Sequence, residues 1–385
     1  MGKLEVVKYL LSQDHSVHHE KNQAGLMGYH LACFQGQIDV VKFLVDFDKT
    51  SLRAIDDNGL TGLHHACGAK NFSAFSSSLT EIFRLYIQED PSVLSMKNNY
   101  GQTPFHHTCV TGNIGLAQCF AHVDLTLLRV KDYNGQTGFH LACSCGHPDL
   151  VEFLGKTDPT FLTNKNSNGQ TGFHLACSLG VTNLVHYAVQ NEPTLLHAKN
   201  DNQETGFHVA CAMGHTNLVE LLINQDPTLL HSVEKNGRTG FHVACSYGQT
   251  HFVEYLGKMD PTLLHAKDHN GLTGFHLACS QQNVEMIKVL MEIDSSVLHV
   301  KDNQGEIAFH KVCWQQNATV MEILIRKDPS ITSIKNQRGE TGLDLGIKVR
   351  KQKQTLTFWI RILLVCVVVL TCCSLLRKLF FLLHN

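Results

Sequence analysis

The chain repeats a short histidine-cysteine pattern at a fixed distance, and this period limits its fold more than any other feature. A His is followed three positions later by a Cys nine times, and the pairs from His106/Cys109 to His310/Cys313 recur every 34 residues. His64/Cys67 precedes them by 42 residues, and His30/Cys33 precedes that pair by another 34. A period of this length is typical of a solenoid, in which identical small units stack in one line.

The unit that begins at Lys131 shows how each repeat is expected to fold. Asn134-Gly135 predicts a turn, and Thr137 suits the N-cap of a short helix that ends near Gly146. A second helix with apolar residues at helical spacing starts at Pro148. Asp158-Pro159 should end this helix, and an extended stretch leads to the next turn. Neither helix can bury its apolar face alone, so neighbouring units must stack.

The segment Asp132 to His147 resembles the ankyrin repeat family, whose unit runs D-x-x-G-x-T-P-L-H-x-A-A-x-x-G-H. Here the residues read Asp-Tyr-Asn-Gly-Gln-Thr-Gly-Phe-His-Leu-Ala-Cys-Ser-Cys-Gly-His. The resemblance extends over roughly nine-tenths of the chain. It implies an all-α fold, an ankyrin-repeat solenoid of helix-loop-helix units joined by hairpin-like loops.

Two departures from the family pattern stand out. The family prefers Pro after the N-cap Thr, but only Thr103-Pro104 follows it, and Gly replaces Pro in most other units. We expect each Gly to cost a helix start about 0.5–1 kcal/mol of backbone entropy. The second full unit also carries eight extra residues around Ala69 to Ser78. We interpret them as a tolerated surface loop, with a partner-binding protrusion as the alternative.

The repeat register predicts the domain boundaries. Residues 1–20 form a partial N-terminal repeat, because Gly2 to Val7 aligns with Gly36 to Val41, so the chain opens inside a unit. Residues 21–345 form the repeat array, which closes with a degenerate unit at Thr341 to Leu345. We expect a basic juxtamembrane linker at 346–356, a transmembrane helix at 357–376 and a short tail at 377–385.

The C-terminal segment predicts a membrane anchor. Residues 357–376 carry one charge, Arg361, and as a helix would be about 30 Å long, which matches a bilayer core. Trp359 and Arg361 suit the interface, and the stretch from Ile362 to Leu376 is uncharged. Alternatively, this helix caps the last repeat or lies in the interface. Palmitoylation is a further hypothesis for the cysteines of this segment, which are Cys366, Cys372 and Cys373.

The distribution of charge predicts the orientation of this anchor. Basic residues crowd its N-terminal flank, with Lys348, Arg350, Lys351 and Lys353 before it and only Arg377 and Lys378 after it. This bias favours a single-pass, tail-anchored membrane protein whose repeats face the cytosol.

Residues 1–345 hold all 34 acidic residues and 25 of the 32 basic ones, a net charge of −9. An acidic body argues against nucleic acid as a partner.

Each His-x-x-Cys pair places a His and a Cys on one helix face, as two ligands of a zinc site would be. Stacked helices lie about 8–10 Å apart and zinc bonds are about 2.0–2.3 Å long, so pairs from two units cannot converge on one ion. We interpret each His as a loop-setting hydrogen-bond partner and each Cys as a reduced, buried core residue. The sequence therefore predicts no catalytic, cofactor or metal residues, no small-molecule substrate and no enzymatic activity.

What remains is a surface for other proteins. In the ankyrin family, partners meet the hairpin tips and the exposed side of the first helix, so the candidates are positions that vary between units. They are Tyr133, Ser167, Asp201, Lys235 and His269 at the tips, and Cys145, Leu179, Met213, Tyr247 and Gln281 on the helices. The predicted function is a membrane-tethered scaffold or adaptor. The alternative is a regulatory or gene-model fragment of a larger ankyrin-bearing membrane protein such as a channel or transporter.

Overall fold

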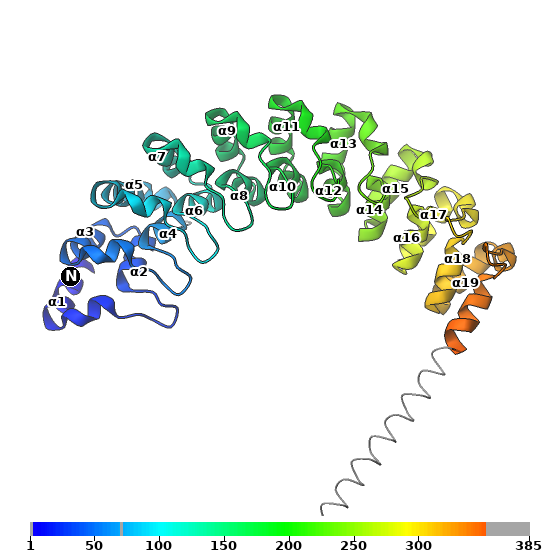
Figure 1. Ribbon diagram of the computed structural model, residues 1–385, viewed down its shortest axis with the longest axis horizontal. Helices are drawn as coiled ribbons and strands as arrows, with labels where there is room; N and C mark the ends of the chain where they lie inside the picture. Colours follow the sequence, from blue (N-terminus) through cyan, green and yellow to red (C-terminus); the bar gives the residue numbers. More distant parts are fainter. Residues whose placement is uncertain (1–2, 70–71, 352–385) are drawn as a thin grey trace, which may run out of the picture. The chain divides into compact units, whose positions relative to one another are not determined.

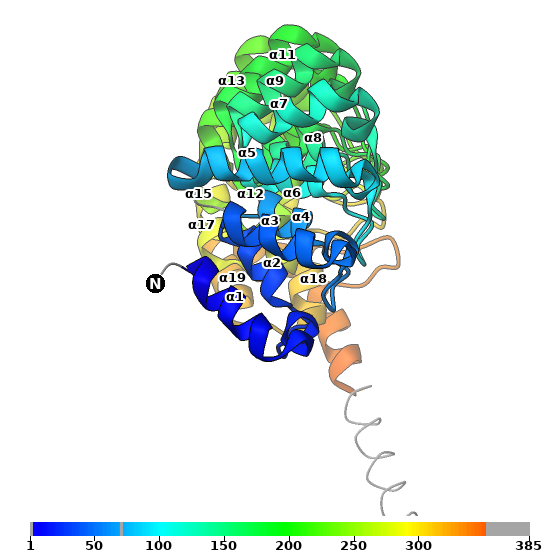
Figure 2. The same cartoon turned by 90° about the vertical axis from the view of Figure 1, so that its left-hand side faces the viewer.

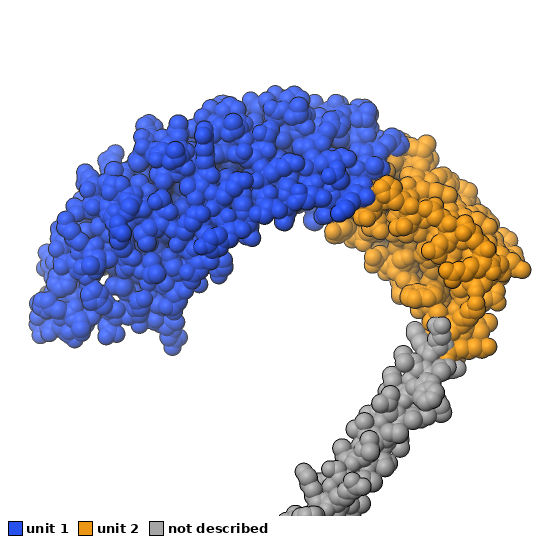
Figure 3. Space-filling view, viewed as in Figure 1, with its two compact units in different colours: residues 1–235 blue, residues 236–385 orange. Residues whose placement is uncertain are grey.

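Two short helices and a loop recur along the chain. In the computed structural model, residues 3–69 and 72–351 are described. The chain forms two compact units, Met1–Lys235 (unit 1) and Asn236–Asn385 (unit 2), which Figure 3 colours separately. Each unit is a stack of its own repeats.

The helices alternate between a first and a second helix of each repeat, after α1 (Lys3–Gln13). The first helices are α2 (Gly28–Phe34), α4 (Gly62–Cys67), α6 (Pro104–Thr111), α8 (Gly138–Cys145), α10 (Gly172–Leu179), α12 (Gly206–Met213), α14 (Gly240–Tyr247), α16 (Gly274–Ser280) and α18 (Ala308–Gln315). The second helices are α3 (Ile38–Phe47), α5 (Phe72–Glu89), α7 (Ile114–Val123), α9 (Pro148–Thr157), α11 (Thr182–Asn191), α13 (Thr216–Gln225), α15 (Thr250–Met259), α17 (Val284–Ile293) and α19 (Ala318–Lys327).

Like helices pack against like helices. In unit 1 the first helices α2 to α12 lie side by side in chain order, and the second helices α3 to α13 form a parallel layer (Figure 1). In unit 2, α14, α16 and α18 form the first layer, and α15 contacts α17. The predicted all-α repeat stack is confirmed, because each helix buries its apolar face between its neighbours.

The core repeats with the sequence. In the repeat of α10 and α11, five core side chains are at most 2% exposed, and they are Phe173, Ala176, Cys177, Leu184 and Val185. Burial of one such aromatic or aliphatic side chain stabilises a fold by about 1.5–3 kcal/mol. The same positions are buried in the neighbouring repeats, so the stack has one continuous core within each unit.

A short helix that the sequence did not predict follows each second helix. Asp158-Pro159 was expected to open an extended stretch, but Pro159–Leu162 forms a 3-10 helix. The Asp158 carboxylate accepts a hydrogen bond from the Thr160 backbone N–H at 3.1 Å, so Asp158 is the N-cap of this turn. The helix-stop signal was correct, and the same residues also start the next turn.

From Phe72 onward, the extra residues of the second full unit do not form a surface loop. They lengthen the second helix, and α5 has 18 residues where the neighbouring second helices have 10. Figure 2 shows the length of α5 across the view. The segment from Phe72 to Glu89 contains no Gly or Pro, and Leu79, Ile82, Phe83 and Tyr86 are buried at helical spacing. Nothing therefore interrupts the helix, and the loop interpretation was wrong.

The described part ends in a helix. Residues 342–351 are helical, so the first residues of the predicted basic linker continue the last repeat. Within residues 3–69 and 72–351, the helices are too short or too polar to cross a membrane. The predicted transmembrane helix at 357–376, with Trp359, Arg361, Ile362 and Leu376, lies outside the described residues, as do Cys366, Cys372 and Cys373.

Candidate functional site

The repeated histidine fixes the loop of the next repeat. The Thr137 backbone N–H donates to His140 Nδ1 at 3.3 Å, and His140 Nε2 donates to the Asn164 carbonyl oxygen at 3.1 Å. Burial lowers the pKa of His140, which keeps the ring neutral with one acceptor and one donor nitrogen. The interpretation of this histidine as a loop-setting residue is confirmed.

The repeated cysteine is a core residue. Cys143 is fully buried, and burial raises the pKa of its thiol. A protonated thiol is a poor metal ligand, because the thiolate is the binding form. Both nitrogens of the adjacent His140 ring are already hydrogen-bonded. Each His-x-x-Cys pair therefore builds the scaffold on which the variable residues lie.

The hairpin tips are joined by main-chain hydrogen bonds. In unit 1 the backbone N–H of Tyr133 donates to Tyr100 O at 3.1 Å, and that of Ser167 donates to Asn134 O at 3.0 Å. Asp201 and Lys235 repeat this bond to the preceding tip at 3.1 and 3.0 Å. Because each tip is fastened to the one before it, the side chains at these positions form a row with fixed spacing. In unit 2 the His269 N–H makes the same bond to Asn236 O at 2.9 Å.

All five predicted tip residues are exposed. Tyr133 has 69% of its surface accessible, although the Lys97 ammonium lies 6.0 Å from its ring centroid. Ser167, Asp201, Lys235 and His269 are also exposed. A large exposed aromatic residue beside a cation is a common element of protein-binding surfaces.

The predicted helix residues lie at the C-terminal ends of the first helices. Cys145, Leu179 and Met213 end the successive helices α8, α10 and α12 of unit 1, and all three are exposed. In unit 2, Tyr247 ends α14 and Gln281 caps α16, again exposed. Since α8, α10 and α12 pack side by side, their ends form a second row.

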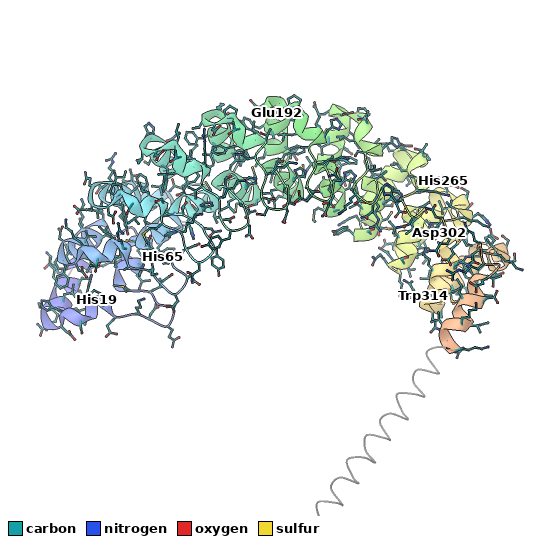
Figure 4. All side chains as sticks on the ribbon, viewed as in Figure 1. His19, His65, Glu192, His265, Asp302 and Trp314 are labelled. Atoms are coloured by element: carbon teal, nitrogen blue, oxygen red, sulfur yellow. The ribbon has the colours of Figure 1, made fainter. Side chains whose placement is uncertain are left out.

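Two exposed aromatic residues were missed by the sequence analysis. Tyr100 is 61% exposed at a tip of unit 1, and Trp314 is 60% exposed on α18 of unit 2 (Figure 4). Trp314 borders a surface cavity of about 410 Å³ that is also lined by Lys311, Glu306 and Arg338. The equivalent positions in the five preceding units are Ser or Ala, so the sequence carried a signal for Trp314. It was missed because it lies one residue before the varying helix position, which is Gln315 in this unit.

A line of Arg–Asp and His–Asp contacts joins successive repeats at the ends of the second helices. In unit 1 the Arg129 guanidinium lies 2.9 Å from Asp158, and His197 Nε2 lies 2.7 Å from Asp226. In unit 2, His265 lies 2.8 Å from Asp294. Hydrogen bonds from Thr228 lower the pKa of Asp226 below its usual value, so this residue is a carboxylate. Exposed pairs of this kind contribute little to stability.

A comparison with protein-family models agrees with this scaffold. A family model described as "Ankyrin repeats (3 copies)" matches residues 1–75, 72–165, 155–228, 173–263 and 259–335. The crystal structure of the human ASB11 ankyrin repeat domain is similar at 21% sequence identity and a TM-score of 0.49, over 59% of this chain and 98% of that chain. A search of the curated proteins found no match. The matched residues extend over most of the chain, which therefore belongs to the ankyrin repeat family.

Proposed function

We propose that the chain is a non-catalytic adaptor that binds a partner protein through the row of tips and the row of helix ends. Ankyrin repeats suggest protein-protein interaction, and the fold is typically a non-enzymatic interaction module. The observation that carries the proposal is that all ten varying positions are exposed while the repeated residues around them are buried. Buried residues that are the same in each repeat keep the fold constant, and exposed residues that vary between repeats can contact a partner protein.

The chemistry of the rows indicates the kind of partner. Leu179 and Met213 are each 45% exposed on adjacent helices of unit 1, and Tyr133 and Tyr247 are more exposed still. Exposed Met, Tyr and Leu residues supply adaptable apolar contact area. The charged tip residues Asp201 and Lys235 supply polar contacts nearby. We therefore expect a partner surface with apolar side chains framed by polar groups.

Substitution at one row tests the proposal. Met213→Asp places a charge in the helix-end row without touching the core, so partner capture should fall by about tenfold or more if the row is a contact. Asn183→Asp changes an exposed residue on α11, in the other helix layer, and should leave capture unchanged. The partner is first identified by proximity labelling from the full-length chain. Equal capture by both variants would remove the helix-end row from the proposed surface.

We further propose that the adaptor is held at a membrane by residues 357–376, with the repeats on the cytosolic side. The support is the sequence: one charge in 20 residues, and a basic flank before the segment. Carbonate extraction of membranes tests the anchor, since the full-length chain should stay in the pellet and a form truncated after Lys353 should be released. If proximity labelling finds the same membrane neighbours with both forms, the anchor is not the tether.

A second candidate function is a regulatory part of a larger ankyrin-bearing membrane protein. The specific observation is on α1, where Val6, Tyr9 and Leu10 are 45%, 64% and 47% exposed. A preceding repeat would cover these apolar side chains, as each repeat covers the next. Sequencing the full transcript separates the candidates, because further repeats encoded upstream would favour the larger protein.

A further inference from the structure

The first 3-10 helix departs from the repeat at a buried position. In the repeat register, a leucine stands at Leu52, Leu94 and Leu128, but the first 3-10 helix, His15–His19, has His18 there. His18 is only 4% exposed. The next 3-10 helix, Lys49–Arg53, has a second departure, since Ser51 takes the place of an apolar residue and is 1% exposed. Two polar groups thus occupy core positions that are apolar in most other repeats.

These polar groups converge with two further ligand-type side chains. His18 Nε2 lies 2.7 Å from Ser51 Oγ and 3.8 Å from Asp48 Oδ2. His19 Nε2 lies 3.5 Å from the same carboxylate oxygen. One ligand atom from each of His18, His19 and Asp48 falls within 4.8 Å of the other two. The cluster lies in unit 1, where Figure 4 labels His19.

The carboxylate of this cluster is held in place. Asp48 is the N-cap of the 3-10 helix, and its Oδ1 accepts from the Thr50 backbone N–H at 2.9 Å. Its Oδ2 accepts from the Thr50 hydroxyl at 2.7 Å and points toward the two imidazoles. His18 is packed against Phe47, with ring centroids 5.4 Å apart. Two of the three side chains are therefore positioned by the fold.

The distances differ from those of the ordinary pairs in the array. His265 and His299 hydrogen-bond directly to Asp294 and Asp328 at 2.8 and 2.7 Å. His19 and Asp48 occupy the equivalent positions, yet their atoms are 3.5 Å apart, too far for a strong direct hydrogen bond. Two ligands of one tetrahedral zinc ion, with bonds of about 2.0–2.1 Å, lie about 3.3–3.4 Å apart.

We propose that His18, His19 and Asp48 bind a divalent first-row transition metal ion, with zinc the best match. Zinc accepts both imidazole nitrogens and carboxylate oxygens as ligands, and three protein ligands leave one position for water. His19 has a side chain that is 62% exposed, which gives the ion a path from solvent. The Ser51 hydroxyl releases His18 Nε2 when the metal binds. The bound ion would link the 3-10 helix His15–His19 to Asp48, the N-cap of the 3-10 helix Lys49–Arg53.

The fold offers matched variants for the test. His19→Ala removes the exposed ligand and leaves the core intact. The double variant His18→Leu with Ser51→Val restores apolar residues of the kind that the other repeats carry at these positions, so it should fold at least as well as the parent chain. His265→Ala is the control, because it removes a histidine from an equivalent pair that is preceded by Leu264 and not by a second histidine.

The experiment is a titration of the full-length chain, in mild detergent and with a non-chelating reductant, with Zn²⁺ in a calorimeter and with Co²⁺ in a visible spectrophotometer. The chain has 25 histidines, so weak binding at other histidines is expected. The proposed site is therefore tested by the difference in metal affinity between the variants. The parent chain and His265→Ala should share one site that is tighter than the rest. In His19→Ala and in the double variant, the affinity of that site should fall by more than about tenfold, and the Co²⁺ absorption bands of the site should disappear.

Two results would overturn the proposal. One is a tight site of unchanged affinity in His19→Ala, with circular dichroism showing that the variant is folded. The other is an equal loss of affinity in His265→Ala, which would place the metal on surface histidines in general. Failure of the metal site would leave the adaptor function untouched, because none of its residues lies in the proposed binding rows.

Discussion

Most of the glycines that follow a capping threonine lie beside an aromatic ring of the preceding repeat. A Cβ atom on Gly172 would lie 2.6 Å from Phe139 and 2.7 Å from Cys143 Sγ, closer than real contacts allow. The exception supports this explanation, since Pro104 follows a repeat that has Leu63 where most others have an aromatic residue. Ala308 follows Phe275, so one methyl group can be accommodated. A proline ring at Gly172 would need more room than the ring of Phe139 leaves.

A double-mutant cycle tests this pairing of ring and glycine. Gly172→Pro introduces the residue that the family prefers, but it should destabilise the chain by about 1–3 kcal/mol because the ring of Phe139 is in the way. Adding Phe139→Leu, the combination seen at Leu63 and Pro104, should recover part of this loss. Urea unfolding of the four chains measures the coupling. Additive effects of the two substitutions would contradict the pairing.

Buried histidines make stability depend on pH. Burial and the charge of His107 lower the pKa of His64 to about 3, and burial with the charges of His106 and His65 lowers the pKa of His107 to about 4. The unfolded chain takes up these protons near pH 6.5, but the folded chain does not. Unfolding is therefore favoured progressively as the pH falls from about 6.5 toward these values.

His107 offers the test, because most other repeats have Leu or Val at its position. His107→Leu should reduce the loss of unfolding free energy between pH 7 and pH 5 by about 1–2 kcal/mol. The measurement is urea unfolding at several pH values, with pH 8 as the reference at which the histidine is neutral in both states. A variant that loses as much stability on acidification as the parent chain would show that His107 is protonated in the fold.

At the scale of helices, the local signals in the sequence predicted the first helices well. Thr137 and Gly146 mark the two ends of α8, as expected. The 3-10 helices were not predicted, because Asp158-Pro159 is equally compatible with the C-terminal end of one helix and with the N-cap of the next. The length of α5 was not predicted either. Its inserted residues have no strong helix preference, and the helix continues because the buried residues after Ser78 hold its axis.

A proline substitution distinguishes a long α5 from a short helix with a loop. Ser77 is exposed and lies in the interior of α5, where proline would remove a backbone hydrogen bond. Ser77→Pro should destabilise the repeat by about 3 kcal/mol, while Ser77→Ala should be neutral or slightly stabilising. Thermal unfolding followed by circular dichroism measures both. A neutral proline would mean that the segment is a loop in solution.

The candidate sites were predicted unequally, for a physical reason. Exposure of residues such as Met213 and Asp201 follows from their place in the repeat, so variation between units was enough to find them. Trp314 was missed because it lies one residue before the varying helix position of its unit. The cluster at His18 was missed because it depends on two residues from different repeats that meet only in the fold, His18 and Asp48.

At the scale of the whole molecule, each repeat contacts only its neighbours, so a complete repeat should be removable. Deleting residues 172–205 joins Thr171 to Gly206, and Gly206 would then lie against Phe139 as Gly172 does now. The shortened chain should fold with unchanged ellipticity per residue and a lower unfolding midpoint. Deleting half a repeat, residues 172–188, is the control and should abolish cooperative unfolding. If both deletions behave alike, the repeats are not interchangeable.

The buried cysteines of the described part have a practical consequence. Nine of them, one in each full repeat, are free and buried, and Cys145 is exposed. A thiol reagent should therefore modify Cys145 in the folded chain and reach each of the nine only when its own repeat opens. Peptide mapping after brief alkylation would then show, repeat by repeat, where this array opens first and in which direction the opening spreads.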